Sequence, residues 1–135
     1  MNSETALSRL KLGYELFDKL AYELLSQSEV LLGEADPPET SGVYLLLLNG
    51  EIRYVGEAKG SGGLRDRLLR KHISGDDKHA IQRALKDEFP NRALRREYIK
   101  KNVSAKWVVV EDFDAIAVLE RLLFWLLGCP AWNKK

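Results

Sequence analysis

Glu120 stands out chemically because it is a carboxylate in the middle of a strongly apolar segment. Residues 115–127 are apolar on nearly all sides of a helix, which predicts that most of that helix surface is buried. An ionised carboxylate in a dry site costs several kcal/mol or more unless it is compensated. Two interpretations follow: an ion pair with a neighbour such as Arg121 or with a basic helix, or coordination of a hard divalent cation, for which oxygen ligands are suited.

Arg67 is the second candidate, because it lies in a basic helical pattern directly after the glycine-rich segment 56–63. Such a loop leaves backbone N–H groups open to phosphate. A planar guanidinium suits phosphate oxygens and can offset the negative charge of a phosphoryl transition state. Arginine-rich helices are common, however, and histidines such as His72 and His79 more often serve packing or surface roles than catalytic ones.

The rest of the composition indicates a single cytoplasmic domain. A chain of 135 residues with 45% hydrophobic residues can build one core. Cys129 is the sole cysteine, so no internal disulfide forms and no Cys/His cluster has zinc spacing. No apolar run approaches the roughly 20 residues of a membrane span, and the first residues do not resemble a secretory signal. We therefore expect no membrane partner.

The segment 43–55 is predicted to form a β-hairpin, because two β-prone runs flank Asn49-Gly50, which supplies the positive φ angles of a tight turn. A strict two-residue turn pairs Tyr44 with Val55 and so places Tyr54 on the opposite face from Tyr44. We therefore predict an irregular hairpin, with a bulge or a longer turn, if both tyrosines line one groove.

The remaining pattern is helical apart from a short strand at 107–110. Apolar residues recur at steps of three and four from Thr5 to about Leu32, which predicts one or two helices before the break at Pro37-Pro38. This stripe packs on the chain's own core or forms the seam of a homodimer. Further helices are expected at 64–73, from Asp76 or Asp77 to about Phe89 before Pro90, at 92–101, and from Asp112 or Asp114 to Leu127.

Charge is unevenly distributed although the net charge is only +1. Residues 1–41 hold three basic against eight acidic groups, a balance of −5, and residues 59–106 hold fourteen against six, a balance of +8. The basic segment would attract a polyanion, although basic helices are also ordinary solvated surfaces.

Taken together, these features resemble the GIY-YIG nuclease family. Gly42-Val43-Tyr44 and Tyr54-Val55-Gly56 are similar to its two motifs, with nine residues between them on one hairpin. Family members then have an arginine on the next helix, a glutamate on a later helix and an asparagine beyond it. These are matched in order by Arg67, Glu120 and Asn133, so the resemblance covers Gly42 to Asn133, about two thirds of the chain.

The resemblance implies an α/β (α+β) fold, with a small three-stranded antiparallel sheet flanked by helices over residues 41–135, preceded by the acidic helical extension 1–38. It implies hydrolysis of phosphodiester bonds in DNA, with RNA not excluded, assisted by one Mg²⁺ or Mn²⁺ ion. In this scheme the catalytic residues are Tyr44, Tyr54, Arg67 and Glu120.

Each residue has an implied role. Tyr44 helps to activate water, Tyr54 orients it or contacts the phosphate, Arg67 neutralises the phosphate, and Glu120 holds the metal. Because the ordinary tyrosine pKa is about 10, the site must favour phenolate or share proton removal with the metal. Supporting positions are Gly56, His72 and Asn133, the last satisfying backbone groups at the groove edge, and nucleic-acid contacts are expected from Lys59, Arg65, Arg70 and Lys71.

Three departures from the family pattern leave alternatives open. Glu57 follows the second motif, where relatives place a lysine or a small hydroxyl residue, and this favours a non-catalytic nucleic-acid-binding module. The long loop leaves Arg65 as an alternative to Arg67, and His72 lies five residues after Arg67 rather than one helical turn. Two other hypotheses concern the extension: an interaction protein that works through its stripe, and an acidic cover over the basic surface.

Overall fold

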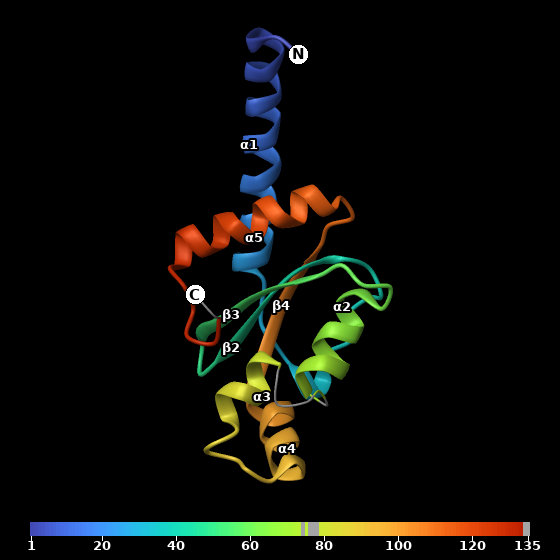
Figure 1. The fold of residues 1–135 in the computed structure, drawn as a ribbon, viewed down its shortest axis with the longest axis vertical. Coiled ribbons are helices and arrows are strands. Elements are labelled where there is room, and N and C mark those ends of the chain that lie inside the picture. Colours follow the sequence, from blue (N-terminus) through green and yellow to red (C-terminus); the bar gives the residue numbers. More distant parts are fainter. Residues whose placement is uncertain (74, 76–78, 134–135) are drawn as a thin grey trace.

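The computed structural model describes residues 1–73, 75 and 79–133 and shows an α+β fold (Figure 1). Its described strands form one antiparallel sheet in the order β1-β4-β2-β3, with helices packed around it and a long N-terminal helix projecting from one end (Figure 1). The strands are β1 (Val30–Leu31), β2 (Gly42–Leu48), β3 (Glu51–Ala58) and β4 (Val103–Val109).

The expected three-stranded sheet is therefore corrected to four strands by β1. The predicted helical extension includes residues 30 and 31, but these residues pair with β4 instead. The reason is local: α1 (Ser3–Ser26) ends before Gln27, whose side-chain amide donates to the Trp107 carbonyl and accepts from the Trp107 N–H, both at 2.9 Å. This pair of bonds directs the chain along the free edge of β4, and a short 3₁₀ turn, η1 (Leu32–Glu34), follows.

Helix α1 is continuous through Gly13, so the extension contains one long helix rather than two. The Asn2 side chain caps it by accepting from the Thr5 N–H at 2.9 Å. Only its C-terminal part, around Ala21 and Leu24, is buried against the domain. The N-terminal part projects beyond the rest of the chain (Figure 1).

The predicted irregularity of the hairpin is confirmed. Asn49 and Gly50 form the turn with φ angles of 55° and 78°, but the ladder shifts between Leu46 and Leu47, where Arg53 stands out of the pairing. Because of this bulge, Tyr54 lies opposite Leu46 rather than Leu45. The two tyrosines consequently share one face of the sheet.

The helices after the hairpin begin with a short α2 (Gly63–Arg65) that continues into a π-helix, η2 (Asp66–Ile73). The chain then forms α3 (Ala80–Leu85) and α4 (Arg92–Asn102). The expected caps at residues 76 and 77 lie outside the described residues, and α3 ends four residues before Phe89. The prediction for α4 is confirmed to within one residue.

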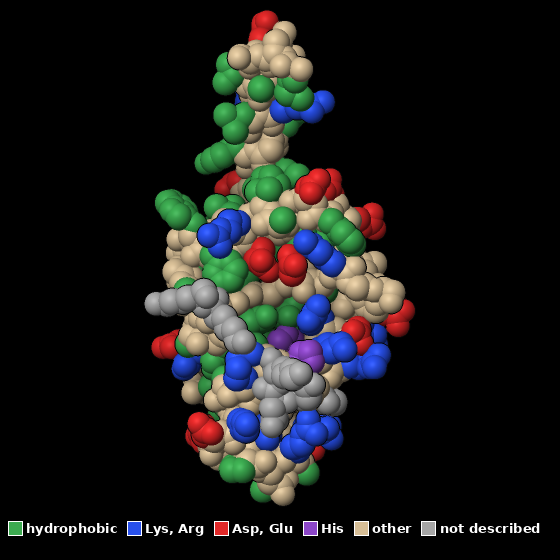
Figure 2. Space-filling view, in the orientation of Figure 1, with side chains coloured by type: hydrophobic (Ala, Val, Ile, Leu, Met, Phe, Trp, Pro, Cys, Tyr) green, Lys and Arg blue, Asp and Glu red, His purple; other side chains and the backbone are tan. Residues whose placement is uncertain are grey.

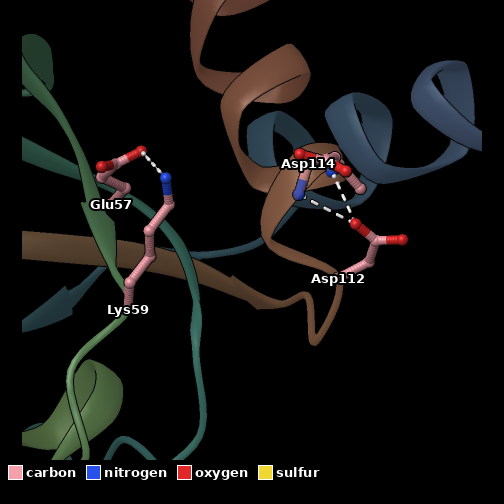
Figure 3. Close-up of polar contacts among 5 residues, drawn as sticks. Glu57, Lys59, Asp112 and Asp114 are labelled. Atoms are coloured by element: carbon pink, nitrogen blue, oxygen red, sulfur yellow. Dashed lines mark hydrogen bonds and ion pairs between the residues drawn. The ribbon is translucent and has the colours of Figure 1, made fainter.

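The last helix, α5 (Phe113–Leu127), is capped by Asp112, whose carboxylate accepts from the N–H groups of Asp114 and Ala115 (Figure 3). It ends at Gly128, which has a φ of 69°. None of the helices in the described part of the chain is long and apolar enough to span a membrane.

Candidate functional site

Tyr44, Tyr54 and His72 form a compact aromatic cluster on one face of the sheet. The Tyr44 hydroxyl and His72 Nε2 are 2.7 Å apart and hydrogen-bonded. The ring centroids lie 5.5 Å apart for Tyr44 and His72, 5.4 Å for Tyr54 and His72, and 6.1 Å for the two tyrosines. Tyr44 and His72 are buried, whereas Tyr54 is partly exposed, so the cluster opens toward solvent on the Tyr54 side.

Gly56 provides the space in which the two tyrosines meet. It pairs with Tyr44 across the ladder. A Cβ atom at this position would lie 2.3 Å from Tyr44 Cζ and 2.7 Å from Tyr54 Cε2. Any side chain here would displace one of the rings, so the second sequence motif has a direct structural reason for its glycine.

The π-helix accounts for the unusual spacing of Arg67 and His72. In a π-helix the hydrogen bonds join residues i and i+5, so residues five apart lie one turn apart on the same face. Burial raises the pKa of Tyr44 and Tyr54 and the Arg67 charge opposes this rise, whereas burial and the Arg67 charge both lower the pKa of His72, so the guanidinium is near enough to act on all three. A spacing that departs from an α-helical turn thus brings both residues into the cluster.

Arg65, the alternative to Arg67, lies elsewhere. Its guanidinium is paired with the Asp36 carboxylate and donates to the Pro37 carbonyl. These contacts hold it against the segment that connects the extension to the domain. The structure therefore brings Arg67, and not Arg65, to the tyrosines.

Two buried side chains outside the predicted set hold the end of the π-helix. Gln82 donates to the carbonyls of His72 and Ile73 at 2.9 and 3.0 Å. Arg95, only 1% exposed, donates to Gln82 Oε1 at 3.0 Å and to the Phe89 carbonyl at 2.9 Å. The chain Arg95–Gln82–His72 fixes the backbone that carries the histidine.

Glu120 lies on α5, at a half-buried position near the same end of the sheet. Burial raises its pKa, as does the nearby charge of Glu57, while the cations of Lys59 and Arg121 lower it. Within the described residues its carboxylate forms no ion pair or hydrogen bond, so an ion pair with Arg121 is not present. Glu57 is paired with Lys59 at 3.5 Å (Figure 3).

The electrostatics of the cluster favour neutral phenols and a neutral imidazole. Burial raises the pKa of Tyr44 well above its ordinary value and also raises that of Tyr54, and Glu120 adds to both effects. Burial, helped by Arg67, lowers the pKa of His72 from 6.5 to about 3. In the described part of the chain, His72 Nδ1 has no hydrogen-bond partner.

Asn133 closes the outer side of the hairpin. Its side-chain oxygen accepts from the Val55 N–H and its amide nitrogen donates to the Val55 carbonyl, each at 2.9 Å. The neighbouring Trp132 N–H donates to the carbonyl of the bulged Arg53 at 2.8 Å. Asn133 thus satisfies backbone groups, which is the structural role expected of it.

Most of the predicted nucleic-acid contacts are already paired or partly buried. Arg70 is bonded to Asp66 at 3.0 Å and Lys59 to Glu57 at 3.5 Å, whereas Lys71 is partly buried on the π-helix. Figure 2 shows basic and acidic side chains around a hollow in which the histidines lie. The +8 balance of segment 59–106 therefore overstates the cationic surface, since Arg95 is also buried.

Groups of three or more His, Cys, Asp or Glu residues able to hold a metal ion do not occur among the described residues. A site with one or two carboxylates nevertheless fits Mg²⁺, which keeps several water ligands and usually takes only one or two from protein carboxylates. The half-buried, unpaired Glu120 carboxylate has the chemistry that such an ion requires.

Comparison of the chain with known protein families, with curated proteins and with solved structures gives no match.

Proposed function

We propose that this chain is a metal-dependent nuclease of the GIY-YIG type that hydrolyses phosphodiester bonds in DNA. The observation that carries the proposal is the 2.7 Å hydrogen bond between Tyr44 and His72 inside a cluster that also holds Tyr54 and the Arg67 charge. This arrangement joins a proton acceptor to a phosphate-binding cation. A purely structural core would require neither.

The hydrogen bond offers a route around the high pKa of Tyr44, because burial disfavours a standing phenolate. When Tyr44 donates to an unprotonated His72 Nε2, its oxygen keeps a lone pair for a water molecule. The water proton passes to Tyr44 as the Tyr44 proton passes to His72, and the hydroxide so formed attacks phosphorus as the bond from phosphorus to the leaving ester oxygen breaks. That oxygen takes a proton from solvent, and His72 later returns one to solvent. No phenolate accumulates in this relay.

Substrate binding is expected to make His72 a better base. Its pKa is lowered to about 3 by burial and by the Arg67 cation. A phosphate seated on Arg67 would offset that positive charge and place a negative charge nearby, which raises the pKa of an imidazole. Proton acceptance would then be favoured only when a phosphodiester occupies the site.

The other residues have roles that follow from their chemistry. Arg67 can form bidentate hydrogen bonds to phosphate oxygens and offset charge that develops during attack. Tyr54, on the open side of the cluster, can orient the water or contact the phosphate. Glu120 would hold one Mg²⁺ or Mn²⁺ ion, which supplies Lewis-acid stabilisation of the leaving oxygen.

The test is cleavage of plasmid and single-stranded DNA in Mg²⁺ or Mn²⁺ by the wild type, Tyr44→Phe and Glu120→Gln, with DNA binding measured in parallel. We expect each variant to lower the cleavage rate by at least about 100-fold, the scale of a lost acid–base or electrostatic group. Tyr98→Phe is the matched control, because Tyr98 stacks on Phe89 at 4.4 Å instead of contacting His72. Metal-dependent cleavage that survives Glu120→Gln would refute the proposal.

A second candidate, a DNA-binding module without activity, is favoured by the Glu57–Lys59 pair. Lys59 brings a cation close to Glu120, where it can occupy the place of a metal. Binding without cleavage by the wild type in both metals would support this candidate. Cleavage that appears on Glu57→Lys or Glu57→Ser would then identify Glu57 as the residue that suppresses the reaction.

A further inference from the structure

The projecting part of α1 carries an apolar stripe that continues directly from the core. Leu7, Leu10, Tyr14, Phe17, Ala21 and Leu24 recur at alternating steps of three and four. Ala21 and Leu24 are buried in the domain, whereas Leu7, Leu10 and Tyr14 are 65–74% exposed. The C-terminal part of this seven-residue repeat pattern is therefore packed against the domain, whereas its N-terminal part lacks a partner within the described chain.

An open apolar notch of about 780 Å³ lies where α1 crosses α5. The walls include Leu10, Tyr14 and Phe17 of α1 and Leu122 and Trp125 of α5. Trp125 is 80% exposed. Figure 1 shows α1 passing α5 and extending beyond it, and Figure 2 shows apolar side chains along the projecting part. The notch and the exposed stripe are thus adjacent parts of one surface.

The structure assigns this surface to a second copy of the same chain, with the two α1 helices antiparallel and the projecting part of each seated in the notch of the other. A twofold arrangement of this kind uses each surface twice, so the exposed stripe and the notch are satisfied together. The register that seats each projecting part in the other copy's notch places Tyr14 of each copy near Phe17 of the other, and Leu10 of each copy near Ala21 of the other.

Charge complementarity supports the antiparallel orientation. Lys11 and Asp18 follow Leu10 and Phe17 directly, so both flank the stripe on the same side, and Asp18 also borders the notch. Antiparallel pairing in the register above brings Lys11 of each copy to Asp18 of the other, twice by symmetry. Parallel pairing would set these charges against the uncharged flank that contains Gly13 and Leu20.

The composition of α1 disfavours a polyanionic or lipid partner. Residues 3–26 hold four acidic and three basic side chains, a balance of −1. Helices that lie on membranes are usually rich in Lys and Arg on the polar face, and nucleic-acid surfaces bind through a cationic excess. Neither condition is met, whereas mixed charge beside an apolar stripe is typical of helix pairing.

The test measures the mass of the full-length chain by analytical ultracentrifugation. We expect the wild type to sediment as a dimer of the 15.4 kDa chain. Leu10→Asp should weaken the dimer by about thirtyfold or more, the loss typical of an interface anchor. Leu12→Asp is the matched control: Leu12 is 66% exposed against 67% for Leu10, in the same helix, but lies off the stripe, so this variant should remain dimeric.

Charge exchange tests the orientation. Lys11→Asp should weaken the dimer several-fold, and Lys11→Asp combined with Asp18→Lys should restore it, because the antiparallel pair is then re-formed with reversed signs. A wild type that remains monomeric at about 100 μM, where a dimer of micromolar affinity would be saturated, would overturn the inference. Equal weakening by Leu10→Asp and Leu12→Asp would also overturn it.

A vesicle-binding measurement distinguishes a lipid surface from a second copy of the chain as the partner of the stripe. Binding of a monomeric wild type to vesicles of phosphatidylserine and phosphatidylcholine, lost in Leu10→Asp, would reassign the stripe to membranes and reject the dimer. Circular dichroism of each variant confirms that α1 remains helical, so a change in mass reports on association.

Discussion

The two faces of the sheet are built from the same strands but differ in chemistry. On one face, Val43, Leu45 and Leu47 join α1 and α5 in a core made of aliphatic side chains. On the other, Tyr44 and Leu46 alternate with them and meet η2, where His72, Gln82 and Arg95 are buried alongside. Adjacent residues of β2 thus serve two separate environments.

The difference lies in how each face satisfies its buried groups. On the aliphatic face, close packing of apolar side chains is the main stabilising interaction. The polar side chains that β4 adds to this face are hydrogen-bonded, Ser104 to the Glu29 carboxylate and Lys106 to the Leu25 carbonyl. The mixed face buries polar atoms, which must be hydrogen-bonded, and it achieves this through the Tyr44–His72 and Arg95–Gln82 contacts. We infer that stability and reactivity are divided between the faces.

The largest expected effect is on the aliphatic face. Leu45 is fully buried, so Leu45→Ala should lower the free energy of unfolding by about 2–5 kcal/mol through lost contacts and a cavity. Tyr44→Phe, one residue away, removes a single hydrogen bond and should cost about 1 kcal/mol. Urea denaturation measures both, and equal losses would contradict the division between the faces.

Gly56→Ala should have an intermediate effect, because the new methyl group meets both tyrosine rings. We expect a loss of about 1–3 kcal/mol in unfolding free energy, the usual cost of overpacking, together with displaced rings. Near-ultraviolet circular dichroism reports the tyrosine environment alongside thermal unfolding. Gly60→Ala is the control, because a Cβ at Gly60 meets nothing within 4 Å; a similar loss in both variants would show that space is not the cause.

The smallest expected effect is the contribution of His72 to the dependence of the unfolding free energy on pH. Its folded pKa of about 3 lies below the ordinary 6.5, so between these values the unfolded chain binds a proton that the folded chain does not. The stabilising contribution is therefore complete above pH 6.5 and is lost as pH falls toward 3, with a slope of at most about 1.4 kcal/mol per unit.

His72→Gln should flatten the dependence of unfolding free energy on pH that the wild type shows between pH 6.5 and 5. Denaturant titrations at a series of pH values measure these slopes. Glu120, with its raised pKa, contributes in the opposite direction, but this contribution is common to the wild type and the variant. An unchanged slope in His72→Gln would mean that the imidazole titrates normally in the folded chain.

Much of the fold could be predicted from sequence where the signal is local. Asn49-Gly50 indicates the hairpin turn, and Asp112, one of the two residues expected to begin the last helix, caps α5. The bulge could be predicted only conditionally, from the requirement that both tyrosines share a face. The strand β1 was missed because two apolar residues have no period of their own and pair only through the edge of β4.

The candidate site was harder to predict because its geometry depends on an uncommon helix. A five-residue spacing between Arg67 and His72 argues against a shared face in an α-helix and supports one in a π-helix, and no local sequence rule separates the two. Arg95 resembled any other residue of a basic segment. Its burial depends on Gln82, thirteen residues earlier, and only tertiary contacts reveal it.

The two hydrogen bonds between the Asn133 side chain and the Val55 backbone also have a consequence for the exposed edge of the sheet. β3 is an edge strand, and the outward N–H and C=O groups of such a strand can recruit a strand from another molecule. Asn133 occupies both groups of Val55, and Trp132 occupies the carbonyl of Arg53, so the C-terminal segment imitates a missing neighbour without forming a strand. Asn133 and Trp132 thereby leave fewer backbone groups on this edge open to pairing with another molecule.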